Sequence, residues 1–162
     1  MRKLFLLLLV LIQSFSLYSQ SKEETQNWIL KELSNHRLSG NIIYSNYFIM
    51  EGYIIEEHYW NVTGKFTFRR SSKIPLKNIY QIQLDKSQVG YIFNLKCKSD
   101  CVANKEFDND GKIENEYLSQ VFEIQIDQGA SSLLNRIPKA LLHLIKLHGG
   151  NAKLVPIKKD PF

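Results

Sequence analysis

The chain lacks the short motifs that mark the common catalytic sites. It has no Gly-x-Ser-x-Gly nucleophile elbow, no phosphate-binding glycine loop and no zinc-binding His-Glu-x-x-His. These absences exclude the enzyme classes that the motifs define, and nothing in the sequence points to a bound cofactor. They leave open an enzyme assembled from distant segments, for which Glu56, His58 and Cys97 are candidates. His58 follows Glu56 at the spacing that places both on one face of a strand.

Cysteine is scarce, because Cys97 and Cys101 are the only two in 162 residues. With no cysteine near the N-terminus, the chain lacks the attachment point of a lipoprotein. An oxidising compartment favours pairing of the two, and a turn after Cys97 would bring their Cα atoms within the roughly 4.4 to 6.8 Å that a disulfide needs. A fully extended segment would instead leave both thiols free. The spacing differs from the Cys-x-x-Cys of redox enzymes.

Long apolar runs are absent except for a short one at the N-terminus. Arg2 and Lys3 precede the apolar run 4–12, and a polar, small-residue segment follows at 16–19, which is the order of a secretory signal peptide. The run is about half of the roughly 20 residues that a membrane span requires. We therefore expect a signal peptide at 1–19 that is cleaved to leave Gln20 first. The mature protein is expected to be exported, periplasmic or secreted, without a transmembrane segment.

No strong charge imbalance is present either. Without Arg2 and Lys3, the 21 basic residues become 19 against 16 acidic ones, a formal charge of +3, which implies no nucleic-acid partner. The signs are nevertheless segregated along the chain. A stretch without acids contains the five basic residues Lys65, Arg69, Arg70, Lys73 and Lys77. These five are the candidates for contact with an anionic ligand or surface, although such runs are commonly just solvated faces.

The acidic counterpart lies between Ser99 and Glu116. Within its segment 106–116, Glu106, Asp108 and Asp110 alternate ahead of Gly111, as in a calcium-binding EF-hand loop. The match is incomplete, because Tyr117 stands where that loop has a bidentate Glu, and no helices flank the segment. An Asn-Asp-Gly turn in a solvated connection between strands accounts for the same residues. Calcium binding therefore remains an alternative.

Local patterns predict an α+β fold. Ser21 and Glu24 form a capping box, so a helix should begin there and end near Ser39 and Gly40. Alternating aromatic and β-branched residues predict strands near 42–50, 53–60, 65–70, 78–85, 89–97 and 118–127. A last helix is expected from Asn135 or Arg136 to the stop signal at 149–150. Short connections between the strands favour an antiparallel meander.

Two segments carry a resemblance to a known superfold. The run from Lys73 to Ile79 leading into a strand, together with the ending from Arg136 to Leu144, resembles the pleckstrin-homology-like (PH-like) superfold and a group of small exported bacterial proteins of unknown function. The resemblance implies a curled antiparallel sheet or partly open barrel of about six to seven strands, with an N-terminal helix and a C-terminal capping helix. One such domain would span 20–153, followed by an extended tail at 154–162.

PH-like domains commonly bind peptides, other proteins or lipid head groups, so the resemblance implies a binding role. Together with the missing catalytic motifs, it favours a non-enzymatic binding or structural module for a protein, peptide or anionic surface. The basic residues at 65–77 and the sheet edges are the expected contacts.

Overall fold

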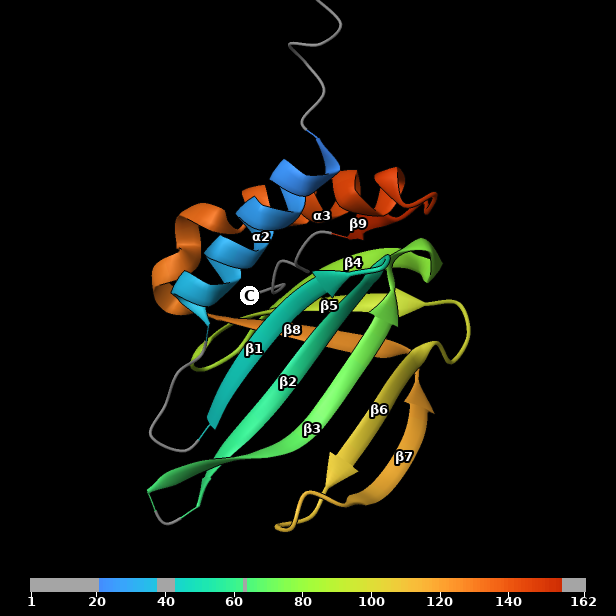
Figure 1. Cartoon of the computed structure of the whole chain (residues 1–162). Helices are drawn as coiled ribbons and strands as arrows, with labels where there is room; N and C mark the ends of the chain where they lie inside the picture. The colour runs from blue at the N-terminus through green and yellow to red at the C-terminus, as the bar shows by residue number, and fades with distance from the viewer. Residues whose placement is uncertain (1–20, 38–42, 63, 156–162) are drawn as a thin grey trace, which may run out of the picture.

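A computed structural model describes residues 21–37, 43–62 and 64–155. The expected signal peptide, the end of the first predicted helix and the tail beyond residue 155 lie outside these ranges. The described chain contains two α-helices and nine strands in two sheets, which confirms the α+β class (Figure 1). The helices are α2 (Lys22–His36) and α3 (Arg136–Leu147), and two short 3-10 helices are η1 (Leu76–Asn78) and η2 (Gln128–Leu133).

The capping box begins α2 as the sequence predicts. The backbone N–H of Ser21 donates to Oε2 of Glu24 at 2.8 Å, and the N–H of Glu24 donates to Oγ of Ser21 at 3.1 Å. One face of this helix buries Thr25, Ile29 and Leu33. The helix ends at His36, three residues before the predicted stop at Ser39.

The larger sheet has five antiparallel strands in the order β1-β2-β3-β6-β7. They are β1 (Ile43–Met50), β2 (Tyr53–Val62), β3 (Lys65–Pro75), β6 (Val102–Phe107) and β7 (Ile113–Ser119). A bulge interrupts the pairing of β2 with β3, because His58 faces Arg70 while Tyr59 faces Phe68. Arg69 is therefore the extra residue at the bulge.

The smaller sheet has the order β8-β5-β4-β9. It contains β4 (Ile79–Lys86), β5 (Gly90–Cys97), β8 (Val121–Asp127) and β9 (Lys153–Val155). The predicted alternation with Tyr80, Ile82 and Leu84 inward is confirmed for Ile82 and Leu84, which are buried while Gln83 and Asp85 bond to each other on the opposite face. At the start of β4 a bulge places Ile79 in the core instead of Tyr80. The short β9 pairs with β4 in parallel, so this sheet is mixed rather than antiparallel.

The strand predictions are incomplete in four places. One is β9, which pairs with β4 although residues from 154 onward were expected to form an extended tail. The sequence signal missed β6 and merged the end of β7 with β8, and it ended β3 at residue 70 instead of 75. These segments are poor in apolar alternation, because β7 is almost wholly exposed and the second half of β3 includes Ser71 and Ser72. The single curled sheet is also replaced by two sheets that do not form a closed barrel.

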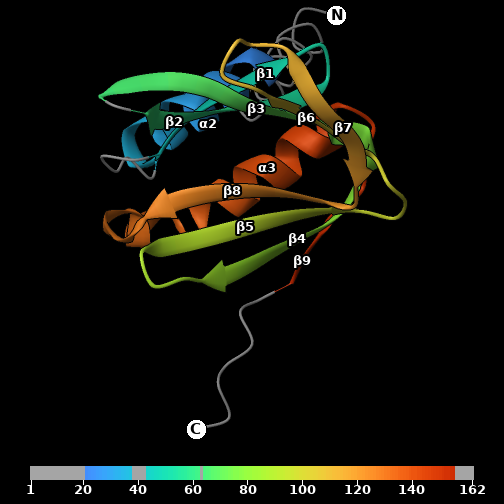
Figure 2. The ribbon, with the colours of Figure 1, turned by 90° about the horizontal axis from the view of Figure 1, so that it is seen from below.

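The two helices lie on the same side of the sheets, at the top of Figure 1, and α3 is seen behind the smaller sheet in Figure 2. Buried side chains from α2, α3 and the facing strands form one core beneath them. Its largest members include Phe93 and Phe122 from the smaller sheet, Ile54 and Ile74 from the larger sheet, and Ile29 from α2. The apolar core thus occupies the helix-covered half of the molecule.

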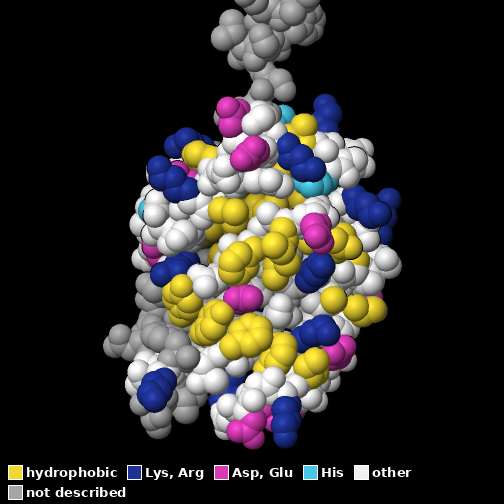
Figure 3. All heavy atoms as spheres, in the orientation of Figure 1, with side chains coloured by type: hydrophobic (Ala, Val, Ile, Leu, Met, Phe, Trp, Pro, Cys, Tyr) yellow, Lys and Arg dark blue, Asp and Glu magenta, His cyan; other side chains and the backbone are white. Residues whose placement is uncertain are grey.

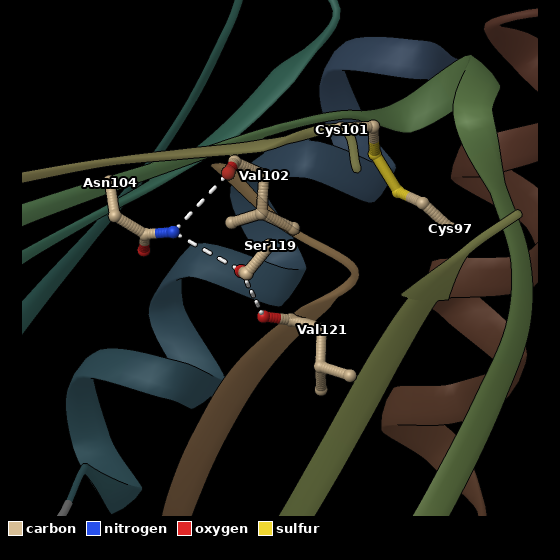
Figure 4. The surroundings of a disulfide bond; sticks show 6 residues. All are labelled: Cys97, Cys101, Val102, Asn104, Ser119 and Val121. Atoms are coloured by element: carbon tan, nitrogen blue, oxygen red, sulfur yellow. Dashed lines mark hydrogen bonds between the residues drawn. A yellow bond between two sulfur atoms is a disulfide. The ribbon is translucent and has the colours of Figure 1, made fainter. Parts of the chain in front are cut away.

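A disulfide joins the sheets at one corner. Cys97 ends β5, and Cys101 immediately precedes β6, with 6.1 Å between their Cα atoms. The predicted pairing is therefore confirmed (Figure 4). The chain also crosses between sheets at Gln120, whose carbonyl accepts from the N–H of Cys97 at 2.9 Å. Both crossings are thus fixed to each other.

Candidate functional site

The larger sheet has an unusual distribution of polarity on its inner face, which is the face turned toward the smaller sheet. Near the helices this face is apolar, with Ile54, Ile74 and Val102 fully buried. Farther along the same strands it becomes polar, and the buried polar side chains of the described chain outside α2 all lie on it: Ser45, Glu56, Ser72 and Asn104. Antiparallel sheets usually place apolar residues inward and polar residues outward. This half of the sheet departs from that rule.

Glu56 is at the centre of the polar region. The residue is buried, and Oε1 accepts hydrogen bonds from Oγ of Ser45 at 2.9 Å and from the hydroxyl of Tyr47 at 3.3 Å. Its other oxygen, Oε2, lies 3.4 Å from Nη2 of Arg70. The alternation of β1 and β2 brings these side chains to one face, because Ser45 is opposite His58 and Tyr47 is opposite Glu56.

His58 completes this cluster, and its hydrogen bonds fix the proton on one ring nitrogen. Nδ1 lies 2.9 Å from Oγ of Ser45 and 3.7 Å from Oε1 of Glu56. Since the Ser45 hydroxyl donates to Glu56, Nδ1 must be the donor to Ser45. In the neutral ring, Nε2 is then left as an acceptor. His58 itself lines a cavity.

The cluster keeps Glu56 ionised. Burial alone would raise the pKa of Glu56, but the nearby N–H of His58, the charge of Arg70 and the hydrogen bond from Ser45 together lower it below its ordinary value. Burial and the neighbouring Glu56 carboxylate raise the pKa of Tyr47, so its hydroxyl keeps its proton. Tyr47 also accepts from the N–H of Gln125 in β8 at 3.3 Å, which links the cluster to the smaller sheet.

A second set of polar side chains lies on the inner face, closer to β7. Oγ of Ser72 donates to Oδ1 of Asn104 at 2.8 Å. Nδ2 of Asn104 donates to Oγ of Ser119 at 3.1 Å, as Figure 4 shows. The hydroxyl of Tyr117 donates to Oε1 of Glu106 at 3.2 Å. These strands therefore present a row of donors and acceptors rather than an apolar surface.

Two cavities open along this face and meet at Arg70. One of about 240 Å³ is lined by His58, Trp60, Arg69, Arg70, Glu106, Phe107 and Glu114. The other, of about 260 Å³, lies between the larger sheet and β8 and is lined by Glu56, Arg70, Ser72, Asn104, Tyr117, Ser119, Val121, Phe122 and Glu123. We call these two cavities together the inner groove.

Arg70 has unpaired hydrogen-bond donors in the inner groove. Among the described residues its guanidinium makes one hydrogen bond, from Nη2 to Glu56, and its buried Nε has no partner. The side chain is 39% exposed, so the N–H groups of Nη1, unlike that of the buried Nε, are accessible at the junction of the cavities. Arg69 is held differently, because it donates to the carbonyl of Phe107 at 3.4 Å and to Oδ1 of Asn109.

The structure separates the five basic candidates. Arg69 and Arg70 line the inner groove, whereas Lys73 lies on the opposite face of β3, with Nζ 3.9 Å from the centre of the Tyr53 ring. Lys65 is exposed at the start of β3, and Lys77 lines a separate cavity near the disulfide. The five residues therefore do not form one basic surface.

The three acidic candidates are also dispersed. Glu106 bonds to Tyr117 on the inner face, while Oδ1 of Asp108 accepts from the N–H groups of Asp110 and Lys112 at 2.9 and 2.8 Å. Asp108 therefore stabilises the turn between β6 and β7. In the described ranges, no three His, Cys, Asp or Glu side chains are grouped closely enough to hold a metal ion.

The dispersed enzyme site does not assemble from its three candidates. Glu56 and His58 lie together, but Cys97 is bonded to Cys101 and lines a cavity with Lys77 and Asn151. Two residues that complete the Glu56 cluster carry no signal in the sequence. The spacing of Glu56 and His58 was visible, but Ser45 and Tyr47 join them only through the pairing of β1 with β2.

Comparisons with protein-family models, curated proteins and solved structures gave no match. Within the part of the chain that the structure describes, no helix is sufficiently long and apolar to cross a membrane.

Proposed function

We propose that this protein is an exported, non-enzymatic binding module, related to the PH-like superfold, whose inner groove binds a short peptide segment through a carboxylate. The observation that carries the proposal is Arg70. Buried Glu56 holds one edge of its guanidinium, and the unbonded Nη1 is accessible where the two cavities meet. A guanidinium oriented in this way matches the two oxygens of a carboxylate.

The rest of the groove fits a peptide better than a simple anion. Acidic side chains at Glu106, Glu114 and Glu123 also line it, and they disfavour a ligand with several negative charges. Peptide backbone offers donors as well as acceptors, and its N–H groups can pair with the carboxylates that line the groove. Trp60 is 50% exposed and provides an apolar wall for a side chain.

The hydrogen bonds of Ser45 favour binding over nucleophilic catalysis. In a Ser-His-acid triad the base accepts the serine proton through one ring nitrogen, while the acid bonds to the other nitrogen. Here Glu56 and Nδ1 of His58 both contact Oγ of Ser45, which donates its proton to the carboxylate. Ser45 is also buried. The triad geometry is absent from this cluster.

The disulfide supports the proposed export, because disulfides persist in oxidising compartments. The PH-like relationship is supported by the strand-rich core with a helix after the last long strand. Mass spectrometry of the protein recovered from outside the cytoplasm tests the location. A chain starting near Gln20 agrees with export, and a retained N-terminal segment contradicts signal cleavage.

The carboxylate site can be tested with a matched pair of small probes, N-acetylphenylalanine and N-acetylphenylalanine amide. Titration of each into the mature protein is followed by NMR through the indole N–H signals of Trp60, in the groove, and Trp28, on α2. We expect the acid to shift the Trp60 signal and the amide to have little effect. Trp28 serves as the internal reference.

Arg70→Gln should abolish the response of Trp60 to the acid. Lys73→Gln is the matched control, because it removes a positive charge from the same strand on the opposite face. The proposal is wrong if the acid and the amide shift Trp60 equally, or if Lys73→Gln weakens the response as much as Arg70→Gln.

A further inference from the structure

The outer face of the larger sheet is aromatic where a solvated sheet face would be polar. Four rings from four strands contact one another in sequence: Tyr44, Tyr59, Phe68 and Phe107. Their centroids are 5.6, 5.5 and 4.6 Å apart, and the rings are tilted against each other. The row crosses β1, β2, β3 and β6, so it follows the width of the sheet rather than a single strand.

Further apolar side chains extend this row. Phe48 and Met50 of β1 are 39% and 54% exposed, and Leu118 of β7 is 61% exposed. Figure 3 shows hydrophobic side chains gathered across this face, with charged side chains of both signs among them. Isolated apolar residues are normal on a protein surface, but a contiguous patch of this kind marks an interaction site. We call this surface the aromatic face.

We infer that the aromatic face packs against the same face of a second copy of this chain, forming a two-fold symmetric dimer. Its size is suitable. Five strands about 4.8 Å apart, with a mean length of about 25 Å, give a flat area of about 500 Å². Protruding side chains enlarge the accessible surface beyond the flat area, toward the roughly 800 Å² per partner of a standard interface.

The charges on this face favour a second copy over an anionic membrane. Arg37 stacks on Tyr44, and Lys73 stacks on Tyr53, at 4.0 and 3.9 Å from the ring centres. Lys105 pairs with Glu116 at 3.0 Å, and Glu57 accepts from the hydroxyl of Tyr59 at 2.7 Å. A face with both signs can complement itself across a two-fold axis. Its acids would be repelled by an anionic lipid surface.

The dimer leaves the inner groove accessible, because the groove lies on the opposite face of the same sheet. Two sheets would meet face to face at about 10 Å, with Tyr, Phe and Met side chains between them. These residue types are enriched in protein interfaces. The two inner grooves would then open on opposite sides of the assembly. The inference does not depend on the proposed ligand of the groove.

Sedimentation equilibrium of the mature protein over micromolar to millimolar concentrations tests the inference. The wild-type protein is expected to be a dimer with a measurable dissociation constant. Phe48→Glu and Leu118→Glu place new charges on the face, so each should weaken self-association by about tenfold or more. Both residues are exposed, and circular dichroism checks that the variants remain folded.

Val89→Glu is the matched control, since Val89 is 63% exposed on the turn between β4 and β5, away from the aromatic face. It should leave the dimer unchanged. A wild-type protein that stays monomeric at the highest concentration overturns the inference, as does a dimer that survives both substitutions. Binding of a monomeric wild-type protein to anionic phospholipid vesicles, abolished by Phe48→Glu, would also overturn it and identify a membrane as the occupant.

Discussion

Glu56 and Arg70 form an ion pair that is buried at one end and open at the other, with Oε2 and Nη2 3.4 Å apart. The carboxylate side chain is 7% exposed, while the guanidinium side chain is 39% exposed. Because the buried partner also bonds to Ser45 and Tyr47, it holds the exposed partner in one position. The hydrogen bonds that hold Glu56 in the sheet therefore also fix the position of Arg70 in the inner groove.

Glu56→Gln should destabilise the fold by about 1–3 kcal/mol, because it leaves Arg70 and His58 without their buried anion. The free energy of unfolding measured by urea denaturation tests this. Glu57→Gln is the neighbouring control on the outer face, and it should cost less than about 1 kcal/mol. An equal loss of unfolding free energy in the two variants would show that the burial of Glu56 does not cause the destabilisation.

The contribution of Glu56 should depend on pH. Its folded pKa is lowered from an ordinary value of 4.5, so the unfolded chain takes up a proton first as the pH falls. The stabilisation is therefore fully present above the unfolded pKa and is lost as the pH falls through the folded pKa. The difference in unfolding free energy between wild type and Glu56→Gln should be constant from about pH 7 to pH 5, and then shrink below about pH 4. A difference that grows on acidification would contradict the lowered pKa.

The disulfide should contribute about 2 kcal/mol, the magnitude that loop-closure entropy gives for a ring of about five residues. The double variant Cys97→Ser with Cys101→Ser should therefore unfold at a lower urea concentration than the wild type. Dithiothreitol should lower the wild type to a similar stability and leave the double variant unaffected. An unchanged wild type, with both thiols shown to be free by mass spectrometry, would contradict this prediction.

Gly90→Ala should destabilise the smaller sheet by about 1–3 kcal/mol through steric overlap. A methyl group at Gly90 would overlap the carbonyl oxygen of Ile126, which belongs to the neighbouring strand β8. Gly111→Ala is the control, because its Cβ would meet open space, although a φ of 77° still costs about 1 kcal/mol. Thermal unfolding of the two variants should rank Gly90→Ala as the less stable, and the reverse order would contradict the steric argument.

The fold was predictable where a local sequence pattern determines the secondary structure. Ser21 and Glu24 specify the start of α2, and the alternation around Ile82 and Leu84 specifies a strand with one buried face. β6 and β7 were missed because their pattern is set by tertiary position. Asn104 is buried by its bonds to Ser72 and Ser119 rather than by being apolar. Hydrophobic alternation cannot identify a strand with a polar inner face.

The candidate site was predictable only in part. Glu56 and His58 are two residues apart, and their common face follows from strand geometry alone. Arg70 was identified as basic, but its separation from Lys73 requires knowledge that β3 is a strand through both positions. Ser45 and Tyr47 are ordinary residues in the sequence. Their role follows from the pairing of β1 with β2, which no local pattern specifies.

The reversed polarity of the larger sheet also affects how its strands find their register. A one-residue slip of β2 would exchange Glu56 and His58 with Glu57 and Tyr59. In this half of the sheet neither face is purely apolar, so hydrophobic burial distinguishes the two alignments weakly. The helix-covered half has no such ambiguity, because Ile54 must face the core. The apolar half of each strand therefore sets the register of the polar half.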